Sequence, residues 1–387
     1  MNDFETDKKY IANTYNRFPV QFTHGKGSLL CDTNGKEYID MGSGIGVTSL
    51  GTADDGWIAA VTEQIMKLQH TSNLYYTQPC ALLAKQLCER TGYDKVFFSN
   101  SGAEANECAI KAARKYAAEN KDGEHYTIVT LNNSFHGRTL TTLAATGQPK
   151  FHEDFQPLTP GFVHATAGSI YELEAITAKY KVAAFMIECI QGEGGVVPLE
   201  QSYVSEMFEF AAYHNILTIA DEVQTGNGRT GKLYSYMHYG IKPDIITTAK
   251  GLAGGLPIGA TLLSEKLSGV FCPGDHGSTF GGNPVSCAAA NYVLSQIDDG
   301  LMEDVQRKGE IIKKELTGAP GVENVTGLGL MIGVKTVKKP YDVVMDCLEH
   351  GVLCLTAHDK VRLLPALNIP DELLYKALSV IRSACAS

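Results

Sequence analysis

Residues 215–224, Asn-Ile-Leu-Thr-Ile-Ala-Asp-Glu-Val-Gln, contain a mainly apolar run at 217–220 that is followed by two carboxylates, Asp221 and Glu222. A nearly continuous apolar run of this length predicts a β-strand that is buried on both faces. Other short runs of the same character lie at 96–99, 128–131, 183–187, 245–248 and 260–263. The middle of the chain therefore contains a set of buried strands.

Helical spacing of apolar residues predicts helices among these strands, at 103–118, 202–213 and 284–297. Strands that alternate with helices favour a mainly parallel sheet that helices cover on both faces. We therefore expect an α/β fold. We expect its chemistry at the carboxyl ends of the strands, where ligands bind on such sheets.

The two ends of the chain differ from this central part. Glycine-containing turns punctuate short strands in roughly the first fifty residues, and a charged helix and a glycine-rich strand pair follow residue 290. We expect an N-terminal segment, 1–58, that packs with a smaller C-terminal α/β domain, 290–387. A large domain, 59–289, would lie between them in the sequence.

The charge and composition of the chain exclude several classes of protein. The 33 Lys and Arg residues against 43 Asp and Glu residues give a formal net charge of −10, which disfavours a nucleic-acid partner. The sequence has no apolar run of about 18 residues, as a transmembrane helix needs, and its polar start lacks a signal-peptide core. We therefore expect a cytoplasmic protein with no membrane partner. The eleven histidines show no ligand spacing, so we expect no metal site.

Three stretches place chemistry-bearing residues at the expected strand ends. Residues 99–106, Ser-Asn-Ser-Gly-Ala-Glu-Ala-Asn, lead from a strand into a helix, whose free N–H groups and dipole suit a phosphate. Asp221 ends a strand, where a carboxylate needs a cation or a donor as its partner. Lys250 follows another strand, and burial favours the nucleophilic form of its amine. Taken alone, each feature has a purely structural alternative. Residues 99–106 could form an ordinary capped turn, Asp221 could cap the next turn, and Lys250 could be a surface lysine.

Together the three stretches predict a cofactor. A phosphate, a ring nitrogen and an aldehyde are the groups by which proteins hold pyridoxal 5'-phosphate, and a lysine and an acidic residue are among their known partners. We expect the large domain, 59–289, to bind this cofactor. A rival motif, Gly-Asn-Gly-Arg-Thr-Gly at 226–231, fits the dinucleotide fingerprint but neither directly follows a strand nor opens a clear helix, which disfavours a nicotinamide enzyme.

Seven blocks of sequence carry a family resemblance: Ser101-Gly-Ala-Glu-Ala-Asn, Asn133-Ser-Phe-His-Gly-Arg-Thr, Gln191-Gly-Glu-Gly-Gly, Asp221-Glu-Val-Gln, Gly228-Arg-Thr-Gly-Lys, Ala249-Lys-Gly-Leu and Gly277-Ser-Thr-Phe-Gly-Gly-Asn. With them the chain resembles, over nearly its whole length, the class III pyridoxal-phosphate aminotransferases, and most closely their acetylornithine branch. The resemblance implies a fold type I transferase, with a mostly parallel mixed sheet in a large domain and a smaller α/β domain.

The resemblance also implies which residues hold the cofactor. Lys250 would bind the aldehyde and move a proton, and Asp221 would pair with the ring nitrogen. Gln224 would approach the ring hydroxyl, and Phe135 would stack on the ring. The remaining cofactor contacts would come from Gly102 and Ala103 at the phosphate and from Glu222, Val223 and Thr279.

Arginines and the partner subunit complete the implied site. Arg138 would hold the carboxylate of the amino donor, and Arg362 would receive the α-carboxylate of glutamate or 2-oxoglutarate. Glu193 would pair with Arg362 when the other substrate is bound. Thr279, with Ser278 beside it, would reach the phosphate or the substrate from the partner subunit, so the resemblance implies a homodimer with shared active sites.

The implied reaction moves the terminal amine of N2-acetylornithine to 2-oxoglutarate, giving N-acetylglutamate 5-semialdehyde and glutamate, in arginine biosynthesis. Succinylornithine, N-succinyl-diaminopimelate, ornithine and 4-aminobutyrate stay open as alternative donors. A racemase, decarboxylase or aminomutase of the same fold is the alternative in another reaction class, and a catalytically silent binding protein is a third. Where the family commonly has Gly-His-x-x-Pro, this chain has Gly-Thr-Ala-Asp-Asp-Gly at 51–56, which we expect to be a surface change.

Overall fold

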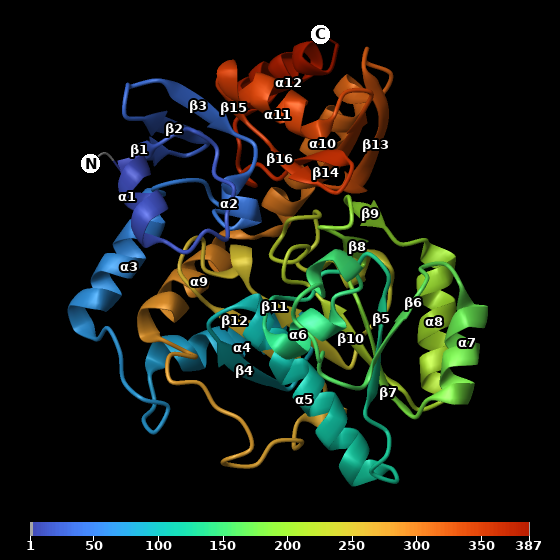
Figure 1. Cartoon of the computed structure of the whole chain (residues 1–387). Coiled ribbons are helices and arrows are strands. Elements are labelled where there is room, and N and C mark those ends of the chain that lie inside the picture. Colours follow the sequence, from blue (N-terminus) through green and yellow to red (C-terminus); the bar gives the residue numbers. More distant parts are fainter. Residues whose placement is uncertain (1–2, 387) are drawn as a thin grey trace.

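A seven-stranded sheet forms the centre of the computed structural model, which describes residues 3–386 (Figure 1). Its strands lie in the order β4 (Lys95–Ser99), β12 (Gly259–Leu263), β11 (Ile245–Thr248), β10 (Leu217–Asp221), β7 (Val182–Ile187), β5 (Thr127–Leu131) and β6 (Phe162–Ala165). Strand β12 runs antiparallel to both of its neighbours, and the other neighbouring pairs are parallel. The predicted α/β fold with a mostly parallel, mixed sheet is confirmed.

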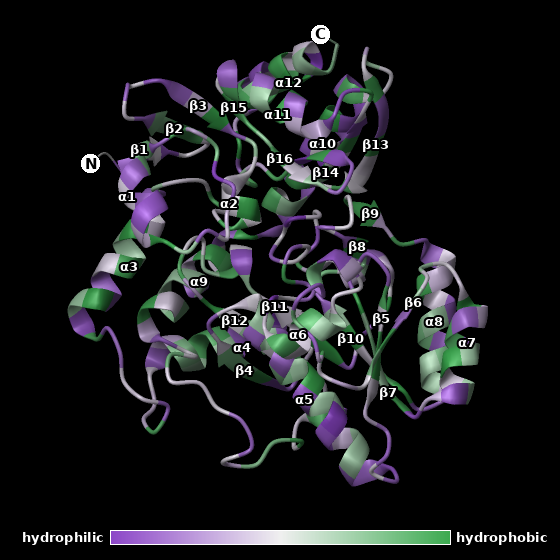
Figure 2. Ribbon diagram, viewed as in Figure 1, coloured by the Kyte–Doolittle hydropathy of each residue, from purple (hydrophilic) through white to green (hydrophobic). Residues whose placement is uncertain are grey.

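The longest helix of the chain, α5 (Gly102–Asn120), packs against β4, β10, β11 and β12. Small residues on its inner face, including Ala105, Cys108 and Ala109, are fully buried and allow the helix to lie close to the sheet. Figure 2 shows that the strands beneath it are mainly hydrophobic. Ser101 caps the helix because its hydroxyl accepts a hydrogen bond from the Glu104 N–H at 3.2 Å.

Further helices and short strands surround the central sheet. The helices are α1 (Asp3–Tyr10), α2 (Ser43–Gly46), α3 (Asp55–Lys67), α4 (Gln78–Thr91), α6 (Leu140–Ala145), α7 (Ile170–Lys179), α8 (Gln201–Tyr213) and α9 (Pro284–Gln296). Strands β8 (Ile190–Gln191) and β9 (Val197–Pro198) form a short antiparallel pair. Across residues 3–386, no helix is long and apolar enough to cross a membrane.

The two ends of the chain meet in one sheet. Strands β1 (Phe22–Lys26), β2 (Leu29–Asp32) and β3 (Glu37–Asp40) are extended by β15 (Val352–Leu353), which runs parallel to β3 (Figure 1). A second sheet contains β13 (Val322–Leu328), β14 (Met331–Thr336), β17 (Lys360–Leu363) and β16 (Leu355–Ala357). Helices α10 (Asp299–Leu316), α11 (Pro340–Glu349) and α12 (Asp371–Ala386) accompany these strands. The division at 1–58, 59–289 and 290–387 stays a prediction, and its second boundary falls within α9.

Arg229 links the loop after β10 to the C-terminal strands. Its guanidinium is buried, and Nη1 donates to the carbonyl oxygens of Pro365 at 2.5 Å and Leu330 at 3.1 Å. Burial lowers the pKa of Arg229 to about 10, while the nearby Asp40 raises it. The side chain therefore satisfies backbone acceptors from two separate segments.

We expect Arg229→Met to lower the free energy of unfolding by about 1–3 kcal/mol, because the variant leaves buried carbonyl oxygens without their donor. Urea denaturation measures this change. Arg382→Met is the control, because Arg382 forms an exposed ion pair with Glu315 at 3.1 Å, and such pairs contribute about 0–1 kcal/mol. Equal losses in the two variants would contradict the linking role of Arg229.

Candidate active site

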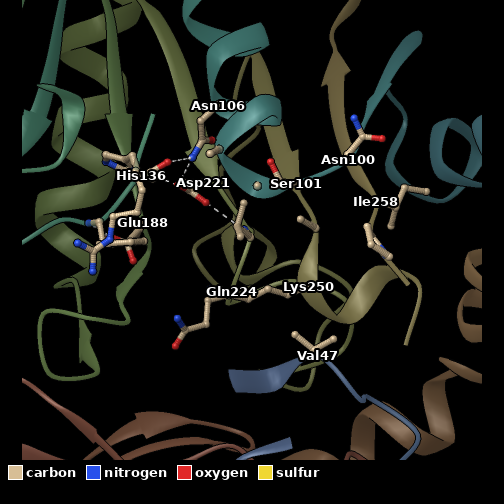
Figure 3. A pocket seen from close by; sticks show the side chains of 18 of the residues that line it. Val47, Asn100, Ser101, Asn106, His136, Glu188, Asp221, Gln224, Lys250 and Ile258 are labelled. Atoms are coloured by element: carbon tan, nitrogen blue, oxygen red, sulfur yellow. Dashed lines mark hydrogen bonds and ion pairs between the residues drawn. The ribbon is translucent and has the colours of Figure 1, made fainter. Parts of the chain in front are cut away.

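A cavity of about 360 Å³ opens at the carboxyl ends of the parallel strands (Figure 3). It lies where ligands bind on open α/β sheets. Separate segments of the chain line it, namely Val47, Asn100–Ala103, Asn106, Phe135–Arg138, Glu188, Asp221, Val223, Gln224, Ala249, Lys250 and Leu256–Ile258. The cavity thus collects residues that lie far apart in the sequence.

Asp221 lies at the end of β10 and is 4% exposed. Its Oδ2 accepts hydrogen bonds from Asn106 Nδ2 at 2.8 Å and from His136 Nδ1 at 2.8 Å, and its Oδ1 accepts from the Val223 N–H at 3.0 Å. Figure 3 shows Asp221 between Asn106 and His136. These donors replace water around the carboxylate and fix its orientation in the cavity.

Glu188 is a second buried carboxylate on the cavity wall, just beyond the end of β7. Its Oε1 accepts from the Phe135 N–H at 2.8 Å, and its Oε2 accepts from the Gly192 N–H at 3.0 Å. Burial raises the pKa of Glu188 to about 7, and the neighbouring Asp221 raises it as well, while His136 lowers it. Glu188 therefore connects the loop of Phe135 to the loop that begins at Gly192.

Lys250 begins the short 3₁₀ helix η3 (Lys250–Leu252), just after β11. Its backbone φ is +40°, a value that non-glycine residues adopt rarely and at an energetic cost. Burial lowers the pKa of the Lys250 amine, and Glu193 raises it. Lys250 lines the cavity together with Gln224, and both are labelled in Figure 3.

The start of α5 forms a wall of the cavity that suits an anion. Gly102 and Ala103 occupy the first turn, whose N–H groups have no partner within an α-helix. A Cβ atom on Gly102 would lie 2.6 Å from Val223 Cγ1. Glycine is therefore required where this backbone approaches the segment that follows Asp221.

The mouth of the cavity carries Arg138 beside two aromatic rings. The Arg138 guanidinium carbon lies 5.4 Å from the ring centre of Phe135 and 4.1 Å from that of Phe151. The two rings meet edge to face at 5.8 Å. Cation–π contacts of this kind hold an exposed arginine in place. The N–H donors of the Arg138 guanidinium are therefore kept at the mouth of the cavity.

Arg362 on β17 forms an ion pair with Glu193 at 2.5 Å between Nη1 and Oε1. The same Nη1 donates to Gln224 Oε1 at 3.0 Å. Arg362 and Glu193 are outside the cavity lining, but Gln224 belongs to it. The pair therefore borders the cavity through Gln224.

Besides Arg362 and Glu193, three further predicted site residues do not line the cavity, namely Glu222, Ser278 and Thr279. Glu222 is fully buried, and its carboxylate accepts from Thr225 Oγ1, Ser235 N and Oγ, and Tyr236 N. Glu222 thus holds the segment after β10 and is turned away from the cavity. Ser278 Oγ accepts from Asn100 Nδ2 at 3.1 Å, and Thr279 is exposed on the same loop.

Asn106, His136 and Glu188 are site residues to which the sequence analysis gave no role. Asn106 is a polar residue on the small, apolar inner face of α5, and His136 directly follows Phe135. Glu188 ends an apolar strand just as Asp221 does. For Asn106, the available signal was a polar residue on an apolar helix face. For Glu188, it was a carboxylate at a strand end.

The residues of the cavity fit pyridoxal 5'-phosphate. The first turn of α5 suits a phosphate, Asp221 presents a buried carboxylate, and Lys250 presents an amine. Among residues 3–386, His136 Nε2 and Arg362 Nε are buried polar atoms that lack a protein hydrogen-bond partner. Buried polar atoms of this kind are often completed by a ligand or water. The fold and the site thus define a pyridoxal-phosphate enzyme.

Residues 10–385 match the model of the aminotransferase class-III family, and the chain belongs to this family. The acetylornithine aminotransferase of Haemophilus ducreyi is 50% identical over 97% of this chain and 96% of its own length. That of Aquifex aeolicus is 45% identical over 96% and 99%. These likenesses confirm the predicted family and cofactor.

Solved structures give the same result. The ornithine aminotransferase from Toxoplasma gondii, crystallised with partial occupancy of pyridoxal phosphate at its active site, superposes with a TM-score of 0.94 at 35% identity and covers 99% of this chain and 93% of its own. The N-acetylornithine aminotransferase from Stenotrophomonas maltophilia superposes with a TM-score of 0.85 at 32% identity, covering 99% and 98%.

We expect Glu188→Gln to change the pH dependence of stability. Because the pKa of Glu188 is raised in the folded state, its contribution to stability is present at acidic pH and is lost as pH rises through about 7. Glutamine does not ionise, so the variant does not lose this contribution to stability as the pH rises. The difference in thermal midpoint between variant and wild type should therefore shift in favour of the variant from pH 5 to pH 8. An unchanged difference would contradict the raised pKa.

Proposed function

We propose that this chain transfers the terminal amine of N2-acetylornithine to 2-oxoglutarate, giving N-acetylglutamate 5-semialdehyde and glutamate. The observation that carries the proposal is the likeness, at 42–50% identity over nearly the whole chain, to relatives named acetylornithine aminotransferase. The arrangement of Arg138, Arg362 and Glu193 around the cavity supports two alternating substrates that both carry carboxylates.

When bound, pyridoxal phosphate supplies an electron-accepting ring for the amine-bearing carbon of the substrate. The first turn of α5 would bind its phosphate, and Phe135 would stack on its ring. Asp221 would pair with the ring nitrogen and hold a proton there. Lys250 Nζ, whose pKa burial lowers, would take the proton from the amine-bearing carbon and deliver it to the former aldehyde carbon of the cofactor.

The two arginines divide the recognition of substrates. Arg138 at the mouth binds the carboxylate of the acylated donor, held by its contacts with Phe135 and Phe151. Arg362 binds the α-carboxylate of glutamate or 2-oxoglutarate when Glu193 releases it. With the acylated donor bound, the Glu193–Arg362 pair stays closed and leaves no free cation at that position.

We also propose a homodimer with shared active sites. Large apolar side chains are exposed together near the loop that carries Thr279, at Leu74, Tyr75, Tyr76 and Phe280. Asn73 Nδ2 donates to the carbonyl oxygens of Ser278 and Gly281, both at 2.9 Å, so the two segments form one surface. Exposed apolar patches of this kind suit a second copy of the chain. Thr279 would then reach the site of the partner subunit.

A panel of amine donors with 2-oxoglutarate tests the proposed reaction. We expect kcat/KM for N2-acetylornithine to exceed that for 4-aminobutyrate at least tenfold, because 4-aminobutyrate lacks the acylamino-bearing carbon, so its carboxylate lies one carbon closer to the amine than the carboxylate that Arg138 binds. Lys250→Ala should lower turnover by about 10²–10⁴-fold or more and remove the visible absorption that depends on Lys250. A lead for 4-aminobutyrate would contradict the assigned donor, and full activity of Lys250→Ala would contradict the reaction class.

Complementation between two inactive variants tests the shared site. In a mixed dimer of Lys250→Ala and Thr279→Glu, one site receives an intact Lys250 and an intact Thr279 from different chains. We therefore expect differently tagged, co-expressed mixed dimers to regain roughly half of the wild-type activity, while each parent dimer stays nearly inactive. Sedimentation analysis checks the dimer itself. A monomer, or mixed dimers as inactive as both parents, would contradict the proposal.

A further inference from the structure

A row of buried side chains crosses the central sheet beneath α5. Asp221 on β10 is the register partner of Thr247 on β11, and Thr247 is the register partner of Thr261 on β12. Residues that pair across neighbouring strands project from the same face of a sheet. Asp221 is 4% exposed, and both threonines are fully buried. The three side chains therefore lie side by side under the helix.

Asn106 of α5 meets this row with both ends of its carboxamide. Its Nδ2 donates to Asp221 Oδ2 at 2.8 Å and to the backbone oxygen of His136 at 2.7 Å. Its Oδ1 accepts from Thr247 Oγ1 at 2.6 Å. Asn106 thus connects Asp221 both to the loop of His136 and to the neighbouring strand.

The contacts allow one orientation of the Asn106 carboxamide. In the opposite orientation its oxygen would face Asp221 Oδ2 and the His136 carbonyl oxygen, which are both acceptors. In the observed orientation the carboxamide oxygen is left needing a donor, and the Thr247 hydroxyl supplies it. Thr247 therefore favours the orientation in which Asn106 donates to Asp221.

We infer that Thr247 is a positioning residue, which acts through Asn106 to hold Asp221 Oδ2 in place. The inference rests on the proposed function, in which Asp221 faces the ring nitrogen of the cofactor. A carboxylate that is held close to this nitrogen keeps a proton on it. That positive charge in turn disfavours a second proton where Lys250 joins the cofactor. Loosening Asp221 should therefore raise the pH at which the absorption of the bound cofactor changes.

Thr261 provides a matched control for Thr247. It is equally buried, lies opposite Thr247 on β12, and donates to α5 through the Ala105 carbonyl oxygen at 2.8 Å. Valine has nearly the shape of threonine but lacks the hydroxyl. Each Thr→Val change removes one hydrogen bond to α5. Only the change at Thr247 removes a hydrogen bond to the Asn106 side chain.

The experiment compares the holoenzymes of Thr247→Val, Thr261→Val and wild type by a pH titration of the cofactor absorption and by steady-state kinetics. For Thr247→Val we expect the spectral midpoint to rise by about half to one pH unit. We expect kcat to fall about 3–10-fold with KM for the amine donor nearly unchanged. Thr261→Val should keep the wild-type midpoint and kcat.

Asn106→Leu and Thr247→Ser keep the test decisive if Thr247→Val holds the cofactor poorly. Asn106→Leu removes the donor itself and should raise the midpoint further, and adding Thr247→Val to it should cause no additional shift, because both changes act on one connection. Thr247→Ser, which restores the hydroxyl, should restore the wild-type midpoint.

A wild-type midpoint in Thr247→Val, equal shifts in the two valine variants, or additive shifts in the double variant would overturn the inference. The failure of the proposed function is a separate result, because it would appear in the wild type. There the protein would lack the cofactor absorption that depends on Lys250, or would lack aminotransferase activity.

Discussion

Burial of the Asp221 carboxylate is the constraint on which the rest of the site depends. A buried carboxylate at the carboxyl end of a parallel strand loses its bound water, so the fold must supply hydrogen-bond donors for it. Those donors come from α5, from the loop of His136 and from the turn that follows β10. The same helix carries Gly102 and Ala103 in its first turn, and the same loop carries Phe135. Satisfying one carboxylate thus fixes the relative positions of the three parts that would hold the cofactor under the proposed function.

The charged groups around Lys250 shift the pKa of its amine in opposite directions. Burial lowers the pKa of its amine, and the carboxylates of Glu193, Asp221 and Glu188 oppose that effect, while Arg362 adds to it. Under the proposed function, Glu193 would leave Arg362 when the α-carboxylate of glutamate or 2-oxoglutarate binds, and the field at Lys250 would change as well. Substrate exchange and proton transfer would then be electrostatically coupled through one carboxylate.

Much of the fold could be predicted from the sequence because buried strands leave a local apolar signal. Strand β11 begins and ends where expected, whereas strand β6, which has the same length, was missed because a histidine interrupts its apolar run, Phe-Val-His-Ala. At the site, Asp221 and Glu222 looked alike, but adjacent residues at a strand end face opposite sides. Asp221 faces the cavity, and Glu222 binds donors elsewhere. Asn106 depends on contacts with residues more than a hundred positions away, which no local pattern contains.

The segment 51–56 shows how a departure from a family motif can be compensated in three dimensions. It was expected to be a surface change, yet it leads into a partly buried contact beside the loop that follows Lys250. Asp54 caps α3 by accepting from the Trp57 N–H at 2.9 Å, and Trp57 Nε1 donates to the Ala253 carbonyl oxygen at 2.9 Å. The usual proline position is Asp55, and a Cβ on the next residue, Gly56, would lie 2.1 Å from Tyr292 Oη. The segment is thus linked to Tyr292 through Gly56, and through Trp57 to the loop that follows Lys250.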